Sequence, residues 1–315
     1  MKYFLVSLLL ILNIKTTAQL YWTKVDSVNT NLPKAVKLFY TNDSIAGKPN
    51  IAYYLEANLK DSELIFDVDT TYKRRLTPNE FYVKNNKPLV IVNCTFFNFK
   101  TNQNLNTVIK NGKNISFNVP TTNGTVNDSL KQLKIYRAAI GISKKCKADV
   151  AWINTDTTYE TILASETPIK PFIKNDSSIL LMKSFTKKNF KKWKMQTAIG
   201  GGPVLLQNGQ ISISNEEEGL FIGKSFYDKH PRTAMGYTKD DKLIILVVQG
   251  RFPNKADGVS LIQEAQILKD IGCIEAINLD GGGSTCMLVN GKETITPSDK
   301  TGQRALPAVF IIKKK

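Results

Sequence analysis

A carboxylate followed by three glycines and a hydroxyl residue is the feature of this chain that points most directly to chemistry. Asp280 ends an apolar run and precedes Gly281, Gly282, Gly283 and Ser284. Glycine costs backbone entropy wherever it is ordered, so three in a row need a reason. One reason is a tight turn, and the other is a site at which an anionic ligand approaches bare backbone N–H groups. The glycine spacing matches neither a P-loop nor a dinucleotide-binding fingerprint.

A second glycine run and a basic pair strengthen the interpretation as a site. TAIGGGPVLLQNG contains Gly201 and Gly202, and HPRTAMGY contains His230 and Arg232. The planar fork of arginine suits phosphate or carboxylate, and histidine has the one unperturbed pKa that suits proton transfer near neutrality. The plain alternative for this pair is a surface histidine beside an ion-paired arginine.

Three further residues are weaker candidates. Arg251 follows the apolar segment LVVQG and either contacts substrate or is an ordinary arginine at a strand end. Glu264 and Asp257 are candidates for a second carboxylate, although Glu264 lies in a helical pattern and has a solvent-facing position as its alternative. No cofactor is expected. A divalent metal near Asp280 stays open, although no ligand cluster argues for one.

The elements around Asp280 are readable from the sequence. SLIQEAQILKDIG predicts a helix that is capped by Ser260 and Gln263 and ended by Gly272. It leads into IEAINLD, a short buried strand with Asp280 at its carboxyl end. The apolar run 89–92 predicts another buried strand, and a polar, aromatic loop begins after it at Asn93.

Hairpin signals recur along the chain. Asn-Gly pairs at Asn111–Gly112, Asn208–Gly209 and Asn290–Gly291 each separate two apolar or alternating segments, and residues 239–242 predict a further turn. We therefore expect an α+β fold with mixed, largely antiparallel sheets, several Asn-Gly hairpins and few helices.

The N-terminus indicates export. Lys2, the apolar run 4–12 and small residues at 16–18 predict a signal peptide over residues 1–18. The protein is expected in the periplasm or outside the cell, with no membrane span after signal removal. The formal charge of the 315-residue chain is +16, which favours an anionic partner such as a glycan.

Nucleic acid is not the expected partner. The basic stretch 183–194 carries interleaved aromatic residues, but such a run is more typical of a solvated amphipathic face. The cysteines are Cys94, Cys146, Cys273 and Cys286, and their spacing, with one histidine in the chain, argues against a usual zinc site. They are either buried thiols or include one optional bridge.

Taken together, the motifs resemble the phosphodiester glycosidase family. The resemblance rests on NLDGGGST after a capped helix, HPRTAMG, AIGGGPVLLQNG, and VNCTFFN followed by the VIKNGK hairpin, and it covers roughly residues 88–312. The resemblance implies a phosphodiester glycosidase-like domain over 88–315. Residues 19–87 carry no part of it and are expected to form an N-terminal β-rich extension packed on that domain, after the signal peptide over 1–18.

The resemblance implies hydrolysis of the bond between an anomeric carbon and a phosphodiester oxygen, with N-acetylglucosamine as one candidate sugar. Asp280 would be the base or nucleophile, His230 a proton donor and Arg232 the phosphate ligand. The other implied substrate contacts are Gly281, Gly282, Gly283, Ser284, Gly201, Gly202, Asn93 and, more weakly, Arg251.

The sequence differs from the family pattern at one place, and two alternative functions stay open. Cys94 and Thr95 stand where the family often has small residues, so the loop with Phe96 and Phe97 is expected to shape a different sugar pocket. One rival is a non-catalytic binding protein for an anionic envelope glycan. The other is a phosphodiesterase that attacks phosphorus.

Overall fold

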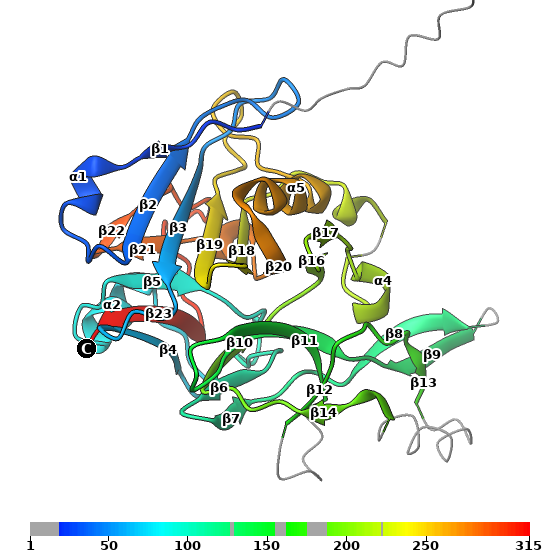
Figure 1. Ribbon diagram of the computed structural model, residues 1–315. Helices are drawn as coiled ribbons and strands as arrows, with labels where there is room; N and C mark the ends of the chain where they lie inside the picture. The colour runs from blue at the N-terminus through cyan, green and yellow to red at the C-terminus, as the bar shows by residue number, and fades with distance from the viewer. Residues whose placement is uncertain (1–18, 127–128, 155–161, 175–187, 222) are drawn as a thin grey trace, which may run out of the picture.

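The computed structural model describes residues 19–126, 129–154, 162–174, 188–221 and 223–315 (Figure 1). The predicted signal peptide, residues 1–18, lies outside the described residues, as does part of the basic stretch 183–194. Within the described ranges, no helix combines the length and apolar character that crossing a membrane requires.

The largest sheet holds the strand that leads to Asp280. Its eight strands pair in the order β1, β2, β3, β19, β18, β20, β16, β17, and every pairing is antiparallel. The strands are β1 (Thr23–Lys24), β2 (Val36–Thr41), β3 (Ala52–Asn58), β19 (Lys242–Val248), β18 (Arg232–Thr238), β20 (Cys273–Asn278), β16 (Val204–Gln207) and β17 (Gln210–Ile211).

A five-stranded antiparallel sheet carries the strand that ends at Asn93. Its order is β22 (Lys292–Glu293), β21 (Met287–Val289), β5 (Val90–Asn93), β23 (Ala308–Lys314) and β4 (Leu64–Thr70). All four residues of β5 are buried, which confirms the buried strand predicted from the apolar run 89–92.

Two further sheets complete the strands of the described chain. One has the order β14 (Lys191–Lys192), β12 (Leu163–Ser165), β11 (Ala148–Asn154), β10 (Arg137–Ile142), β15 (Thr197–Gly200), β6 (Val108–Lys110) and β7 (Lys113–Ser116). The other is β13 (Phe172–Ile173), β9 (Ser129–Lys134) and β8 (Thr121–Val126), which extends to one side in Figure 1.

Helices are few and short in the part of the chain that the structure describes. They are α1 (Asp26–Asn29), α2 (Pro78–Lys84), α4 (Asn215–Glu218) and α5 (Leu261–Ile271), with 3₁₀ turns η1 (Gly223–Phe226) and η2 (Gly282–Ser284). The capped helix predicted from the sequence is confirmed as α5: Ser260 and Gln263 form the capping box, and Gly272 ends the helix with φ of 101°. Sheets that are largely antiparallel and helices that are few agree with the expected fold class.

The Asn-Gly pairs lie between paired strands. Strands β6 and β7 pair Lys110 with Lys113, and the two residues between them, Asn111 and Gly112, have φ of 52° and 74°. The same two-residue spacing with positive φ at both positions joins β16 to β17 through Asn208–Gly209 and β21 to β22 through Asn290–Gly291.

One hydrophobic core connects the sheets. It includes Leu38 and Leu55 from the eight-stranded sheet, Val92 and Phe310 from the five-stranded sheet, and Ile140 from the seven-stranded sheet. Strands from residues 19–87 thus share both a core and sheets with strands from the rest of the chain.

The cysteines carry no bridge. All four thiols are free, and Cys94, Cys273 and Cys286 are buried while Cys146 is half-buried. Cys94 and Cys286 pack into different core clusters, although both adjoin the Asn93 region. The alternative of buried thiols therefore describes this structure better than the bridge.

Candidate active site

Asp280 is held at the meeting point of two sheets. It lies two residues beyond β20, and its backbone N–H donates to the carbonyl of Cys94, just beyond β5, at 2.8 Å. The fully buried Asn93 donates from Nδ2 to the Asp280 carbonyl, while its Oδ1 accepts from Thr233 Oγ1 at 2.9 Å and from the Cys286 N–H at 3.1 Å. Asn93 thus fixes the backbone of Asp280 rather than lining open space.

The carboxyl group of Asp280 has an unusual environment. Burial raises its pKa to about 7, and hydrogen bonding from Ser284, the charge of Arg304 and the Gly281 N–H act against that rise. A carboxyl with a pKa near 7 exchanges protons readily at neutral pH, which is the property that general acid-base chemistry needs.

The glycine loop is shaped by close contacts. Gly282 has φ of 62°, and a Cβ there would lie 2.9 Å from Nη2 of Arg251. Its N–H donates to the Pro231 carbonyl at 2.8 Å, and the N–H of Ser284 donates to the Gly281 carbonyl at 3.2 Å. Two of the N–H groups expected to face an anion are therefore used within the protein.

Two guanidinium groups border this loop. Arg251 lies against Gly282, and Arg304 lies against Gly283 and donates from Nη1 to Ser284 Oγ at 3.3 Å. Arg304 also pairs with Asp299, with 2.6 Å between Nε and Oδ2. Positive charge thus stands on both sides of the Asp280 loop, which suits an anion held by side chains.

Arg232 has a different setting from these two arginines. Its residue is only 3% exposed, its Nε donates to the Val259 carbonyl at 3.0 Å, and its Nη2 donates to the Asp228 carbonyl at 3.1 Å. Its guanidinium also lies 5.6 Å from the ring centroid of Phe221. These contacts make Arg232 a brace for the segments around it.

His230 is half-buried beside the same cations. Burial, followed by the charges of Arg232 and Arg251, holds its pKa below the ordinary value, with Asp228 acting in the opposite sense. Its Nδ1 is buried and has no hydrogen-bond partner among the described residues. A neutral imidazole at pH 7 accepts a proton more readily than it donates one.

Glu264 is buried, so its solvent-facing alternative is wrong. It is 0% exposed, and neither carboxyl oxygen has a hydrogen-bond partner in the described part of the chain. Burial raises its pKa to about 8, and the charge of Arg232 lowers it. Asp257 adjoins Arg251, whose backbone N–H lies 3.5 Å from the Asp257 carbonyl.

The second glycine run packs on β20. Gly202 precedes Pro203 through a cis peptide bond, and its N–H donates to the Asn278 carbonyl at 2.8 Å. A Cβ at Gly201 would lie 2.5 Å from that same carbonyl oxygen. Gly201 and Gly202 therefore let the turn approach the backbone that leads to Asp280.

Glu218 and Arg304 are important polar residues that the sequence motifs missed. Glu218 is fully buried, and its carboxylate accepts from the backbone N–H groups of Ala138 and Val204, each at 2.9 Å, and from Ser214 Oγ at 2.6 Å. Arg304 lies in a polar loop without a motif. The one sequence signal that could have found Arg304 is the rarity of arginine, since the chain has six arginines and far more lysines.

The aromatic loop after Asn93 points in two directions. Phe96 has its ring centroid 6.4 Å from that of Phe221, on the Arg232 side. Phe97 packs on Phe99 with 4.6 Å between centroids, and the Arg304 guanidinium lies 5.2 Å from the Phe99 centroid. The loop therefore contacts Arg304 through Phe99 and the neighbourhood of Arg232 through Phe221. In the described part of the chain, no group of three His, Cys, Asp or Glu side chains is arranged to hold a metal ion.

Comparison with known proteins points to one family. Residues 163–313 match the phosphodiester glycosidase family. The chain is 33% identical over 104 residues to N-acetylglucosamine-1-phosphodiester alpha-N-acetylglucosaminidase of Mus musculus, which covers 30% of this chain and 20% of the mouse protein. The human enzyme of the same name is 32% identical over 104 residues, with the same coverage. The match thus spans about a fifth of the length of these curated relatives.

Solved structures extend the likeness across the fold. The catalytic domain of the zebrafish N-acetylglucosamine-1-phosphodiester alpha-N-acetylglucosaminidase superposes with a TM-score of 0.59 at 23% identity, covering 95% of this chain and 89% of that one. A hypothetical protein from Synechocystis gives a TM-score of 0.61 at 13% identity, covering 94% and 64%. At these identities the likeness concerns the fold. The family match over residues 163–313 and the similarity to these relatives support the resemblance of this chain to the phosphodiester glycosidase family.

Proposed function

We propose that this protein hydrolyses the glycosidic bond of a sugar-1-phosphodiester and releases the free sugar and a phosphomonoester. The observation that carries the proposal is the position of Asp280, a carboxyl with a pKa of about 7, on a loop bordered by Arg251 and Arg304. The reaction needs a carboxylate near an oxocarbenium-like centre and cationic donors for the departing phosphate. Asp280 supplies the carboxylate, and Arg251 and Arg304 supply the cations that border its loop.

The proposed step breaks the bond between the anomeric carbon and the phosphate oxygen. The ionised Asp280 either attacks the anomeric carbon or removes a proton from the water that does. The electron pair of the broken bond leaves with the phosphomonoester, whose charge Arg251 and Arg304 stabilise. A phosphomonoester is a fair leaving group, so charge stabilisation carries more of the catalysis than a strong general acid does.

The remaining site residues are proposed to support this step. Asn93 orients Asp280 through its carbonyl, and Gly201 and Gly202 let the neighbouring turn close on β20. Arg232 braces the loop after His230, and a neutral His230 accepts a proton from water or sugar. Ser284 links Arg304 to the Asp280 carboxyl.

We further propose that the protein is exported and acts on an anionic glycan. The apolar N-terminal segment and the net charge of +16 support this. N-acetylglucosamine is the first sugar to test, because the mammalian relatives are named for it.

The test is turnover of the purified protein on the methyl phosphodiesters of several sugar-1-phosphates, with Asp280→Asn alongside. Free sugar released by the native protein and lost in the variant supports the proposal. Hydrolysis in ¹⁸O-labelled water identifies the bond: label in the sugar supports a glycosidase, whereas label in the phosphate indicates attack on phosphorus. Glycan binding without turnover in either protein would replace the proposal with a binding function.

A further inference from the structure

A cavity of about 630 Å³ lies next to the aromatic loop, apart from the residues proposed for chemistry. Three segments line it: residues 70–73 after β4, residues 101–104 of the aromatic loop, and residues 115–117 at the end of β7. Its size is in the range of small-ligand sites, so its lining identifies the ligand that would fit.

The apolar part of the lining is unusually open. Tyr72 is 83% exposed, Phe117 is 45% exposed and Ile115 is 44% exposed. Large apolar side chains gathered around one cavity mark a binding surface more often than scattered ones do. Aromatic rings with an open face suit a flat ligand with an apolar side, and the carbon face of a pyranose ring is such a side.

The polar part of the lining carries almost no charge. The Gln103 amide supplies donors and an acceptor, and Asn102 Oδ1 and Ser116 Oγ supply further acceptors, since Ser116 Oγ donates its own hydrogen to the Asn106 carbonyl. Asn102 Oδ1 is buried and has no partner among the described residues. The one charged residue in the lining is Lys73, whose Nζ lies 5.1 Å from the Tyr72 ring centroid. Such a lining favours a neutral ligand rich in hydroxyl groups.

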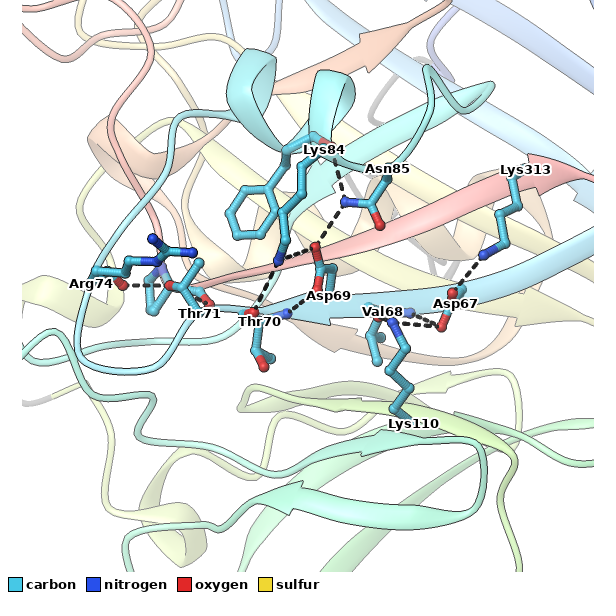
Figure 2. Close-up of polar contacts among 12 residues, drawn as sticks. Asp67, Val68, Asp69, Thr70, Thr71, Arg74, Lys84, Asn85, Lys110 and Lys313 are labelled. Carbon is cyan, nitrogen blue, oxygen red and sulfur yellow. Dashed lines mark hydrogen bonds and ion pairs between the residues drawn. The ribbon is translucent and has the colours of Figure 1, made fainter.

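The cavity wall at the end of β4 is fixed in place. Figure 2 shows Lys84 Nζ pairing with Asp69 at 2.7 Å and donating to the Thr70 carbonyl at 3.4 Å. Thr71 Oγ1 donates to the carbonyls of Arg74 and Pro307. A wall held this way loses little conformational entropy when a ligand binds.

The opposite wall is tied to this one and to the catalytic loop. Asn102 Nδ2 donates to the Lys73 carbonyl at 3.3 Å, which joins two of the lining segments. Phe97 forms a β-bridge with Asn104, a lining residue, and packs on Phe99. Because Arg304 lies over Phe99, the two residues Phe97 and Phe99 connect the cavity wall with the guanidinium beside Asp280.

We propose that this cavity is a subsite for the uncharged glycan that carries the phosphate in the substrate. The inference rests on the proposed function for its place in the reaction: the scissile sugar lies at Asp280, its phosphate at Arg304, and the sugars beyond the phosphate reach the cavity past Phe99. Tyr72 and Phe117 provide stacking faces, and Asn102 and Gln103 bind hydroxyl groups.

The first test measures binding and does not depend on turnover. Trisaccharides of glucose, of N-acetylglucosamine and of mannose are titrated against the full protein by calorimetry and ligand-observed NMR. We expect at least one to bind, and Tyr72→Ala and Phe117→Ala each to weaken it by tenfold or more. Tyr21→Ala, which removes an aromatic ring that is 76% exposed outside this cavity, should have no effect. Thermal unfolding checks that all three variants fold.

No binding of any trisaccharide, or binding that both variants retain, would overturn the subsite. The second test compares kcat/KM for two phosphodiesters of N-acetylglucosamine-1-phosphate. One carries a methyl group beyond the phosphate, and the other carries there the trisaccharide that binds. The two variants should lose tenfold or more on the trisaccharide substrate alone. Equal loss on both substrates contradicts the subsite. Absence of turnover on both substrates with trisaccharide binding intact would reject the proposed function and leave the subsite standing.

Discussion

Arg304 donates from Nε to Asp299 Oδ2 at 2.6 Å, and the same guanidinium donates from Nη1 to Ser284 Oγ at 3.3 Å. Asp299 therefore fixes an arginine next to the glycine loop while part of its guanidinium stays available. Fixed donors stabilise a developing negative charge without reorganising at the moment of reaction. This pair is the structural reason for assigning phosphate recognition to Arg304.

Arg304→Lys should raise KM for a sugar-1-phosphodiester by about tenfold or more, because lysine keeps the charge but loses the planar fork. Steady-state kinetics on the methyl phosphodiester measures this. Arg74→Lys is the matched control, since Arg74 is exposed and is not among the residues that contact the Asp280 loop. Equal KM values for native protein and Arg304→Lys would remove Arg304 from phosphate recognition.

Arg232→Lys should act on stability instead. Two backbone carbonyls, those of Val259 and Asp228, accept from the buried Arg232 guanidinium, and a lysine cannot reach both with the same geometry. Loss of a charged hydrogen bond in a buried site costs about 1–3 kcal/mol of unfolding free energy. Urea denaturation measures it. An unchanged urea midpoint together with a tenfold rise in KM would instead support Arg232 as a ligand of the substrate phosphate.

Asp280→Asn should stabilise the protein more at pH 8 than at pH 5. Burial raises the pKa of Asp280 to about 7, so the folded state holds a proton that the unfolded state has released, and unfolding free energy falls as pH rises from about 4 to about 7. Asparagine has no proton to release, so the variant does not lose unfolding free energy over this pH range. Thermal unfolding of both proteins at the two pH values measures the difference.

Asp299→Asn is the control, for which we expect the opposite dependence of stability on pH. Burial acts to raise the pKa of Asp299, but hydrogen bonds from Arg304 and Thr301 outweigh it and lower the pKa. Its stabilisation is present above the unfolded pKa, so this variant should lose stability at pH 8 and lose less as pH falls toward 4. Parallel pH trends in the two variants would contradict the environments described for these carboxyls.

The sequence predicted the elements around Asp280 well because local signals define them. The Ser260 capping box and the glycine stop at Gly272 specify α5, and the apolar run before Asn93 specifies a buried strand. Arg304 could not be predicted as a neighbour of Gly283, because the contact depends on the long-range pairing of β23 with β5. Helical periodicity alone likewise left the direction of Glu264 undecided.

Gly202→Ala should destabilise the protein by several times the cost of Gly209→Ala. Both glycines have positive φ, 131° and 73°, but a Cβ at Gly202 is directed at the buried carboxylate of Glu218, whereas nothing lies within 4 Å of a Cβ at Gly209. The control isolates backbone strain of about 1 kcal/mol from the added overlap. Urea denaturation measures the unfolding free energy of both variants. Equal decreases would show that Glu218 moves away from the added Cβ without an energetic cost.

Glu264→Gln should be nearly silent for stability at pH 4 and stabilising at pH 8. Burial raises the pKa of Glu264 from 4.5 to about 8, so at pH 4 the carboxyl is largely neutral in the folded and unfolded states and glutamine reproduces its shape and charge. Between pH 4.5 and pH 8 the unfolded state releases the proton, while the folded state keeps it because no hydrogen-bond donor among the described residues stabilises the ionised carboxyl. The unfolding free energy of the native protein therefore falls over this range, and glutamine avoids that loss. Calorimetric unfolding measures both values. Kinetics adds a second reading: turnover retained by Glu264→Gln at pH 6 removes Glu264 as a second catalytic carboxylate, and a thousandfold loss with unchanged stability would restore it to that role.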